Sequence, residues 1–264
     1  MGASPQLHRD FEVVDVFGIP VARLDLAGVL RRVQGAIRSP GPAPLCLAYV
    51  NAHSCNLFFE DPAFRRALAR ADLIYVDGNG PRLAAWLAGD HLPRRMTGAD
   101  WVYDLCTLAE GEGYRLYLLG SAPGVAEECA ARLRRLYPRL SILGLRDGYF
   151  RPEAEPALLE EIRRLHPDIL LLGMSSPRQE TWMAEKASEL HLPVVWAAGG
   201  VLEYASGRER RAPRWMRQLG LEWLGRWLID PRRLTGRYLV GVPLFLYRAA
   251  GHAIARRVRP RRAG

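Results

Sequence analysis

The sequence predicts an α/β protein with a Rossmann-like, mostly parallel sheet that helices cover on both faces. Six short apolar runs are typical of strands buried on both sides. Segments with helical spacing separate these runs, and the alternation repeats at roughly 25-residue intervals. Three of the runs end in glycine or Asp-Gly and pass directly into a helix. This pattern predicts a functional site at the carboxyl ends of the strands.

The elements follow one another in a regular order. A small β-hairpin is expected first, over Phe11–Val21 and outside the main sheet. The strands of the main sheet are predicted at Leu45–Val50, Leu73–Val76, Leu116–Leu119, Ile142–Leu145, Ile169–Leu172 and Val194–Ala197. Helices are predicted at Leu24–Ile37, Ser54–Ala69 with a break at Asp61-Pro62, Pro81–Ala88, Ala99–Ala109, Val125–Leu136, Glu155–Leu165 and Pro177–Leu190.

The composition is that of a globular protein with a sizeable core. The 264 residues are 49% hydrophobic and 25% charged. The first twenty residues lack an apolar segment typical of a signal peptide, and the apolar runs are shorter than the roughly 20 residues that span a bilayer as a helix. The four cysteines form no C-x-x-C pair and have no histidine at metal-ligand spacing, so we expect reduced thiols and no metal site.

The charge is concentrated at the carboxyl end. Residues 208–264 hold fifteen arginines and three acidic residues, a net charge of +12, whereas residues 1–207 carry −3. Tryptophans and an apolar segment, Leu239–Tyr247 with Gly241 and Pro243 inside it, accompany the arginines. This composition suits a membrane interface and its anionic lipids. We therefore predict a catalytic core over residues 1–207 and a basic, aromatic-rich, membrane-associating appendage over residues 208–264.

Polar side chains follow two of the predicted strands directly. Asn51 can cap the next helix or hold a ligand hydroxyl. Asp77 precedes Gly78 and Asn79, where it is either a turn residue or a general base facing the cleft. The nearby His53 is a weaker candidate for a base, because a lone histidine more often serves structure or contacts solvent. The pattern alone leaves both alternatives open for Asn51 and for Asp77.

Other strand ends carry turns suited to phosphate groups. Gly120 and Ser121 link a strand to a helix in the manner of a nucleotide-phosphate turn, although the segment is neither G-x-G-x-x-G nor a Walker loop. Gly173 ends another strand, and Gln179 and Glu180 lie in the first turn of the helix that follows. The remaining candidates at this edge are Arg95, Gly199 and Gly200.

These motifs, taken in order, resemble the WecG/TagA/CpsF glycosyltransferases, glycosyltransferase family 26. The resemblance covers about Phe11 to Tyr238. The segments that carry it are VNAHSCN at 50–56, DGNG at 77–80, RMTGAD at 95–100, LYLLGSAPG at 116–124, SPRQE at 176–180, the Gly199-Gly200 turn, RAP at 211–213, GLEW at 220–223 and DPRR at 230–233. Tyr49 stands where the teichoic-acid members carry Thr, and the YVNAHSCN form is more similar to exopolysaccharide members.

The resemblance implies an enzyme that moves a hexose or N-acetylhexosamine from a UDP-sugar to a polyprenyl-diphosphate-linked sugar in surface polysaccharide synthesis. It implies inversion, with no required metal and no cofactor. Asp77 matches the proposed general base, and Asn51 matches the residue beside the sugar. The substrate-binding residues that we predict are Gly78, Asn79, Arg95, Gly120, Ser121, Gly173, Gln179, Glu180, Gly199, Gly200, Arg211 and Arg214.

The expected partners are the UDP-sugar, the polyprenyl-diphosphate-linked acceptor and the membrane surface. The protein is expected in the cytoplasm, peripheral on the inner face of the cell membrane, and the resemblance favours self-association. No nucleic-acid partner is expected, because no recognised binding module is present. The alternative functions are a nucleotide-dependent oxidoreductase on a Rossmann-like sheet and a non-catalytic lipid-binding protein.

Overall fold

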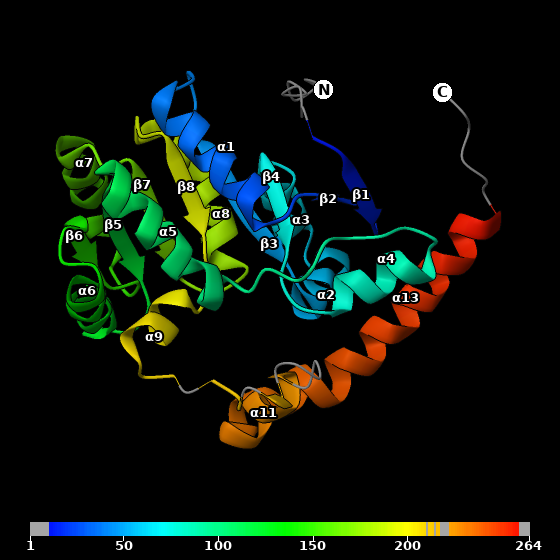
Figure 1. Cartoon of the computed structure of the whole chain (residues 1–264). Coiled ribbons are helices and arrows are strands. Elements are labelled where there is room, and N and C mark those ends of the chain that lie inside the picture. The colour runs from blue at the N-terminus through cyan, green and yellow to red at the C-terminus, as the bar shows by residue number, and fades with distance from the viewer. Residues whose placement is uncertain (1–10, 210, 214, 217–221, 259–264) are drawn as a thin grey trace.

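The computed structural model describes residues 11–209, 211–213, 215, 216 and 222–258, and its centre is a six-stranded parallel sheet (Figure 1). Each predicted strand is present, and the predicted α/β class is confirmed. The strands are β3 (Leu45–Val50), β4 (Leu73–Val76), β5 (Arg115–Gly120), β6 (Ser141–Arg146), β7 (Ile169–Gly173) and β8 (Val194–Ala197).

The strand order brings distant segments of the chain together. The sheet has the order β4-β3-β8-β7-β5-β6, so Leu47 of β3 pairs with Leu73 of β4 on one side and with Trp196 of β8 on the other. Because all pairs are parallel, the carboxyl ends of β3, β4 and β8 lie next to one another at one edge of the sheet. The ends of β5 and β6 lie further along that edge.

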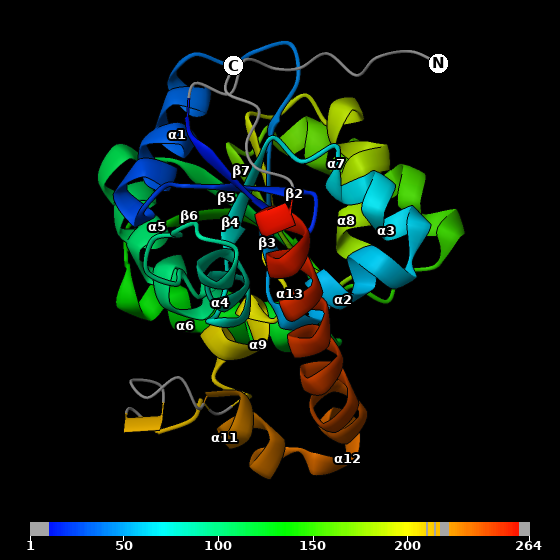
Figure 2. The ribbon, with the colours of Figure 1, turned by 90° about the vertical axis from the view of Figure 1, so that its right-hand side faces the viewer.

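Helices cover both faces of the sheet, as expected (Figure 2). The helices of this region are α1 (Leu26–Arg38), α2 (Ala52–Glu60), α3 (Pro62–Leu68), α4 (Gly80–Leu87), α5 (Gly98–Glu112), α6 (Val125–Leu136), α7 (Glu155–Leu165) and α8 (Arg178–Lys186). Two short 3-10 helices, η1 (Pro152–Ala154) and η2 (Ala187–Glu189), adjoin α7 and α8, so the predicted helix to Leu190 ends as a 3-10 turn.

Alternate residues of each strand enter two separate apolar layers. In β7, Leu170 and Leu172 pack with α2, α3, α7 and α8, whereas Ile169 and Leu171 pack with α1, α5 and α6. Strands buried on both faces need apolar side chains at every position, which explains why their sequences are continuous apolar runs rather than alternating ones.

Two local features predicted from sequence are confirmed. The hairpin consists of β1 (Val13–Val16) and β2 (Ile19–Ala22), which form a separate antiparallel sheet. Asp61 separates α2 from α3, because its carboxylate accepts from the backbone N–H groups of the second helix while Pro62 occupies the first helical position.

The carboxyl-terminal part begins with α9 (Val201–Ser206), which packs on the sheet. It continues through α11 (Glu222–Ile229), α12 (Pro231–Thr235) and a π-helical turn, η3 (Gly236–Val240), into the long helix α13 (Gly241–Val258). The helix is continuous through Gly241 and Pro243.

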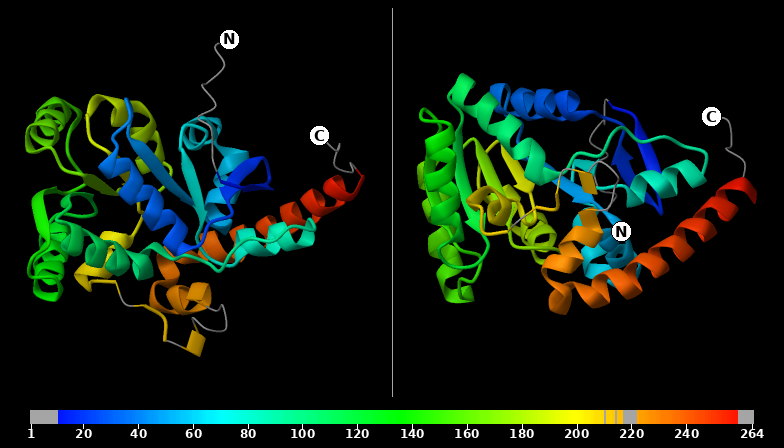
Figure 3. Two further views of the ribbon diagram at one scale, coloured as in Figure 1. Left: turned by 45° about the horizontal axis from the view of Figure 1, so that its top comes forward. Right: turned by 60° about the horizontal axis from the view of Figure 1, so that its bottom comes forward.

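Helix α13 lies across the core beside α2 and α4 (Figure 3). Its inner face is held by polar contacts. Arg248 donates to the side-chain oxygen of Asn56 at 2.9 Å, and Asn56 donates to the carbonyl of Gly241 at 2.7 Å. Near its end, Arg256 pairs with Asp90 at 3.2 Å. The sequence boundary at residue 207 stays a prediction, but α13 is anchored to the core along its length.

The segment Gly236–Arg257 forms 22 residues of helix, long and apolar enough to cross a membrane by length and composition. This corrects the expectation, drawn from uninterrupted apolar runs, that no segment reaches that length. The run-based estimate stopped at residue 247, whereas Ala249, Ala250, Ala253 and Ile254 extend the apolar helix beyond Arg248.

Candidate active site

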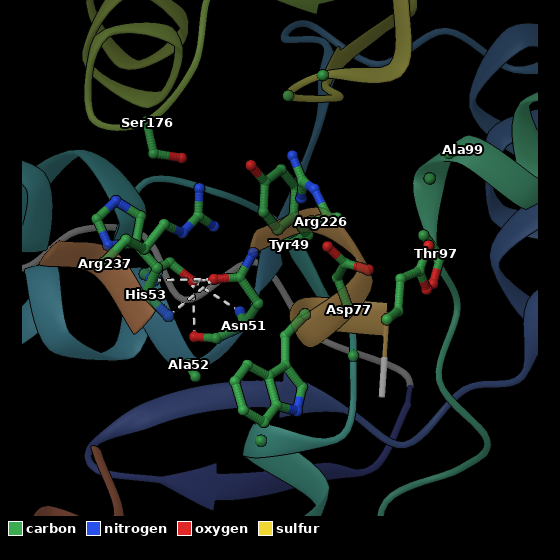
Figure 4. Close-up of a pocket in the computed structure, with 18 of the residues that line it drawn as sticks. Tyr49, Asn51, Ala52, His53, Asp77, Thr97, Ala99, Ser176, Arg226 and Arg237 are labelled. Atoms are coloured by element: carbon green, nitrogen blue, oxygen red, sulfur yellow. Dashed lines mark hydrogen bonds between the residues drawn. The ribbon is translucent and has the colours of Figure 1, made fainter. Parts of the chain in front are cut away.

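A cavity of about 780 Å³ opens at the carboxyl ends of β3, β4 and β8 (Figure 4). The sheet forms its floor, and the segments α11, α12, η3 and α13 form its far wall. Seven of the predicted site residues line it: Asn51, Asp77, Gly78, Asn79, Arg95, Gly199 and Gly200. The site predicted at the strand ends therefore coincides with an open cavity.

Asp77 stands at the end of β4 with its carboxylate at the cavity wall. Its backbone N–H donates to the carbonyl of Val50 at 2.8 Å, which ties the ends of β3 and β4 together. Burial raises the pKa of Asp77 to about 6, while a hydrogen bond from the side chain of Asn51 opposes the rise. At neutral pH this carboxylate is largely ionised, yet it is basic enough to accept a proton in a reaction.

Asn51 both caps a helix and contacts Asp77. Its Oδ1 accepts from the backbone N–H groups of His53 and Ser54, at 3.0 and 3.1 Å, in a capping box at the start of α2. The oxygen is thereby occupied, so the amide nitrogen Nδ2 is the group through which Asn51 lowers the pKa of Asp77. The capping role predicted for Asn51 is confirmed, and its role in holding a ligand hydroxyl stays a prediction.

Carboxylates hold Arg95 of the core and Arg211 of the appendage in place. Glu222 of α11 pairs with Arg95 at 2.6 Å and with Arg211 at 2.8 Å, and Arg211 also pairs with Asp100. Burial alone would raise the pKa of Glu222, but the bonds from Arg211 and Arg95 outweigh it and keep this pKa below its usual value. Arg211 does not itself line the cavity. Its ion pairs with Glu222 and Asp100 fasten α11 to the core.

Arg226, also on α11, does line the cavity. It pairs with Glu209 at 3.3 Å and lies over the ring of Tyr204, with its guanidinium carbon 5.5 Å from the ring centre. Its Nε is buried and has no hydrogen-bond partner among the described residues. Arg214 lies outside the described residues.

Gln179 and Glu180 are fully buried behind the cavity wall. Gln179 Oε1 accepts from the backbone N–H of Gly199 at 2.9 Å, and its Nε2 donates to Glu180 Oε1 at 2.9 Å. Ser176 donates to the same carboxylate oxygen at 2.7 Å. The two predicted donor-binding residues therefore do not line the cavity, although Gly199 and Ser176, which they hold, do.

The turn at Gly120 and Ser121 is packed against the end of β7. Ser121 N–H donates to the carbonyl of Gly173 at 2.8 Å, and Gly148 N–H donates to the carbonyl of Ser121 at 2.9 Å. A Cβ on Gly120, whose φ is +143°, would overlap the backbone of Gly173. None of these residues lines the cavity. Their predicted role in phosphate binding stays a prediction.

Sequence reasoning missed Arg237 of the far wall and considered His53 only as a candidate base. Arg237 of η3 and His53 lie together on one side of Asn51, opposite Thr97 and Ala99 (Figure 4). Burial, with a smaller contribution from Arg237, lowers the pKa of His53 to about 4, so its imidazole is neutral at pH 7. No pattern in the sequence links these residues, because 183 positions separate them.

Apolar side chains complete the same wall. Those that line the cavity from α12 and α13 are Leu234, Val242, Phe245 and Leu246. Within the part of the chain that the structure describes, no group of three or more His, Cys, Asp or Glu is placed to hold a metal ion. The cavity thus combines a basic carboxylate, arginines and an apolar wall.

Comparison with known proteins adds to this geometry. The model of the glycosyl transferase WecG/TagA/CpsF family matches residues 14–259. The N-acetylglucosaminyldiphosphoundecaprenol N-acetyl-beta-D-mannosaminyltransferase of Staphylococcus aureus strain NCTC 8325 is 27% identical over 237 residues, which cover 90% of this chain and 92% of the relative. The proteins of the same description from strains COL and MRSA252 are similar to the same extent, with 27% identity and the same two shares.

Proposed function

The chain belongs to the WecG/TagA/CpsF glycosyltransferase family and is a glycosyltransferase; we propose that it transfers a hexose or N-acetylhexosamine from a UDP-sugar to a polyprenyl-diphosphate-linked sugar, with inversion. The observation that carries this proposal is the carboxylate of Asp77 at the wall of the large cavity, with a pKa of about 6. The product would serve the assembly of a surface polysaccharide.

In the proposed reaction Asp77 acts as the general base. It accepts the proton of the acceptor hydroxyl as that oxygen bonds to the anomeric carbon of the donor. The bond from this carbon to the UDP oxygen breaks at the same time, and UDP leaves with the electron pair. A base on the acceptor side and a leaving group on the opposite face produce inversion. The side-chain amide of Asn51 favours the ionised form of the carboxylate before the transfer.

The arginines are proposed to stabilise the leaving diphosphate. Arg95 and Arg226 both line the cavity. Fixed guanidinium groups are suited to charge that develops on a leaving group. In the structure Arg95 pairs with Glu222 and Arg226 pairs with Glu209, so each is already held in place. Arg211 would then act through Glu222, which positions Arg95.

The descriptions of the relatives name one particular transferred sugar. Those proteins are described as transferring an N-acetyl-beta-D-mannosaminyl group to N-acetylglucosaminyldiphosphoundecaprenol. We propose the same acceptor class for this chain. Tyr49 lines the cavity, where its ring occupies space beside Gly199. With a phenol at this position, we propose that the donor sugar is either an N-acetylhexosamine or a hexose.

A membrane surface is the proposed location, on the inner face of the cell membrane. Support comes from the outward face of the last helices. Between residues 239 and 255, the exposed side chains are apolar, small or Tyr247, and none is charged. The largest are Leu239, Val240, Leu246, Tyr247 and Ile254. An apolar face of this length, with arginines beyond it, is typical of a helix that lies in the membrane interface.

The test is a transfer assay with full-length protein, a panel of UDP-sugars and a polyprenyl-diphosphate-N-acetylglucosamine analogue. We expect one UDP-sugar to give a disaccharide product, with inversion visible in the anomeric coupling of its NMR spectrum. Stabilisation of the protein by UDP and not by NAD in thermal unfolding is expected alongside. Product with retained configuration, or stabilisation by NAD alone, would contradict the proposal.

A further inference from the structure

Among the arginines that line the cavity, Arg237 differs in having no carboxylate partner in the described structure. Arg95 and Arg226 each form an ion pair, with Glu222 and Glu209 respectively. The contact recorded for Arg237 is with the ring of its neighbour Tyr238, whose centre lies 6.0 Å from the guanidinium carbon. Its Nε is buried, with no hydrogen-bond partner among the described residues.

A buried donor on an unpaired cation has a high cost unless a ligand satisfies it. An anion is therefore the expected partner of Arg237. Its neighbours suit a phosphate oxygen. His53 and Ser176 line the cavity on the same side (Figure 4). The hydroxyl proton of Ser176 is taken by Glu180, so the imidazole of His53 is the neutral side-chain donor here. The imidazole stays neutral at pH 7 and adds no charge of its own.

The surroundings of Arg237 indicate which anion. It lies on η3, directly before α13, and Val242 of the next turn lines the cavity. Leu246, one turn further, lines the cavity and is 45% exposed. Leu83 of α4 also lines the cavity and is 37% exposed. Apolar, partly exposed side chains of α13 and α4 therefore line the same cavity as the guanidinium.

We propose that Arg237, with His53, binds the diphosphate of the lipid-linked acceptor, and that the polyprenyl chain of this acceptor leaves the cavity over Val242, Leu246 and Leu83. This subsite rests on the proposed function, because it assigns the second substrate of that reaction. A uridine ligand gains nothing from the apolar side chains. A prenyl diphosphate can bind the guanidinium through its diphosphate and the apolar side chains through its prenyl chain. The donor diphosphate then belongs beside Arg95 and Arg226.

The direct test measures binding without transfer, by titration calorimetry on the full chain. The probes are farnesyl diphosphate, farnesol and UDP. Arg237→Gln is expected to weaken farnesyl diphosphate binding about 10- to 100-fold, as loss of a charged hydrogen-bonding group does. UDP binding stays unchanged. Farnesol is expected to bind weakly to both proteins, because it lacks the diphosphate.

Three further variants sharpen the comparison. Arg237→Lys keeps the charge but lacks Nε, so we expect part of the lost affinity to return. Arg226→Gln should weaken UDP and spare farnesyl diphosphate. Arg31→Gln, an exposed arginine of α1, is the matched control and should change neither. Thermal unfolding of each variant checks that it is folded.

Failure of the subsite differs from failure of the proposed function. The subsite is overturned if wild-type protein does not bind farnesyl diphosphate, if Arg237→Gln binds it unchanged, or if that variant loses UDP binding to the same extent. The reaction is overturned, and the subsite kept, if no UDP-sugar is transferred while farnesyl diphosphate binding still depends on Arg237. In an active enzyme, Arg237→Gln should raise the KM for acceptor and leave the KM for UDP-sugar unchanged.

Discussion

The side-chain amide of Asn51 lowers the pKa of the Asp77 carboxylate, across the ends of two neighbouring parallel strands. The oxygen of the same amide caps α2, so the helix fixes the direction in which the donor points. A donor to a carboxylate favours its ionised form. Burial and Asn51 therefore act in opposite directions on the pKa of Asp77, which stands at about 6.

Asn51→Ser separates the two roles of Asn51. Serine caps a helix about as well as asparagine, so the free energy of unfolding should change little. The donor to Asp77 is lost, and the pKa of Asp77 should rise above about 6. Because the base must be ionised, activity rises with pH through this pKa, and the rise should move to higher pH in the variant. An unchanged pH profile of kcat/KM would show that Asn51 does not tune the base.

Glu222→Gln tests the fastening of α11 to the core. The change leaves Arg95 and Arg211, both partly buried, without their shared counter-ion. We expect a loss of about 1–3 kcal/mol in the free energy of unfolding and faster hydrogen exchange in α11. Glu128→Gln, which breaks an exposed pair with Arg208, is the matched control and should do neither. Equal exchange rates in α11 of both variants would contradict this role.

Substitutions of Glu180 test whether this residue supports the cavity wall or binds the donor substrate. Its Oε1 accepts from Ser176 and Gln179, and a glutamine oxygen can accept both bonds. Burial raises the pKa of Glu180, so a neutral replacement suits its site. We expect Glu180→Gln to keep the UDP-sugar KM, and Glu180→Ala to lose roughly 2 kcal/mol of stability. A large rise in the UDP-sugar KM of a stable Glu180→Gln protein would instead support the donor-binding role predicted from sequence.

The outward face of α13 can be tested without unfolding the protein. Tyr247 and Ile254 are 79% and 62% exposed, so Tyr247→Glu and Ile254→Glu should leave thermal stability unchanged. Each should weaken binding to anionic liposomes roughly tenfold or more, because an apolar contact is lost and a negative charge is introduced. Leu136→Glu, at a 53% exposed position on α6, is the control. Sedimentation with vesicles measures the effect, and equal retention of all variants would exclude this face.

The sheet could be predicted from sequence because strands buried on both sides must be apolar throughout. The break at Asp61-Pro62 was equally readable, since both residues have strong positional preferences at helix ends. The length of the final helix could not be predicted from the sequence in this way. Arg248 interrupts the apolar run in sequence, but in the structure it faces the core and leaves the outer face uncharged.

Which of the turns at the strand ends form one site could be predicted only in part, for a different reason. Strand order depends on tertiary packing, so the sequence could not tell which turns are neighbours. Asn51, Asp77 and Gly199 lie together because β8 inserts beside β3. Gly120 lies two strands away from β8, and its turn is packed against Gly173. Arg237 and His53 likewise line one cavity only because η3 and α13 return to the core.

The central claim is that Asp77 is the base of a sugar transfer in this cavity. Its most direct test is single-turnover transfer by Asp77→Asn, with UDP affinity measured by titration on the same preparation. The account predicts a rate lower by about 10²- to 10⁴-fold and an unchanged affinity for UDP. Turnover at the wild-type rate by the folded variant would contradict it.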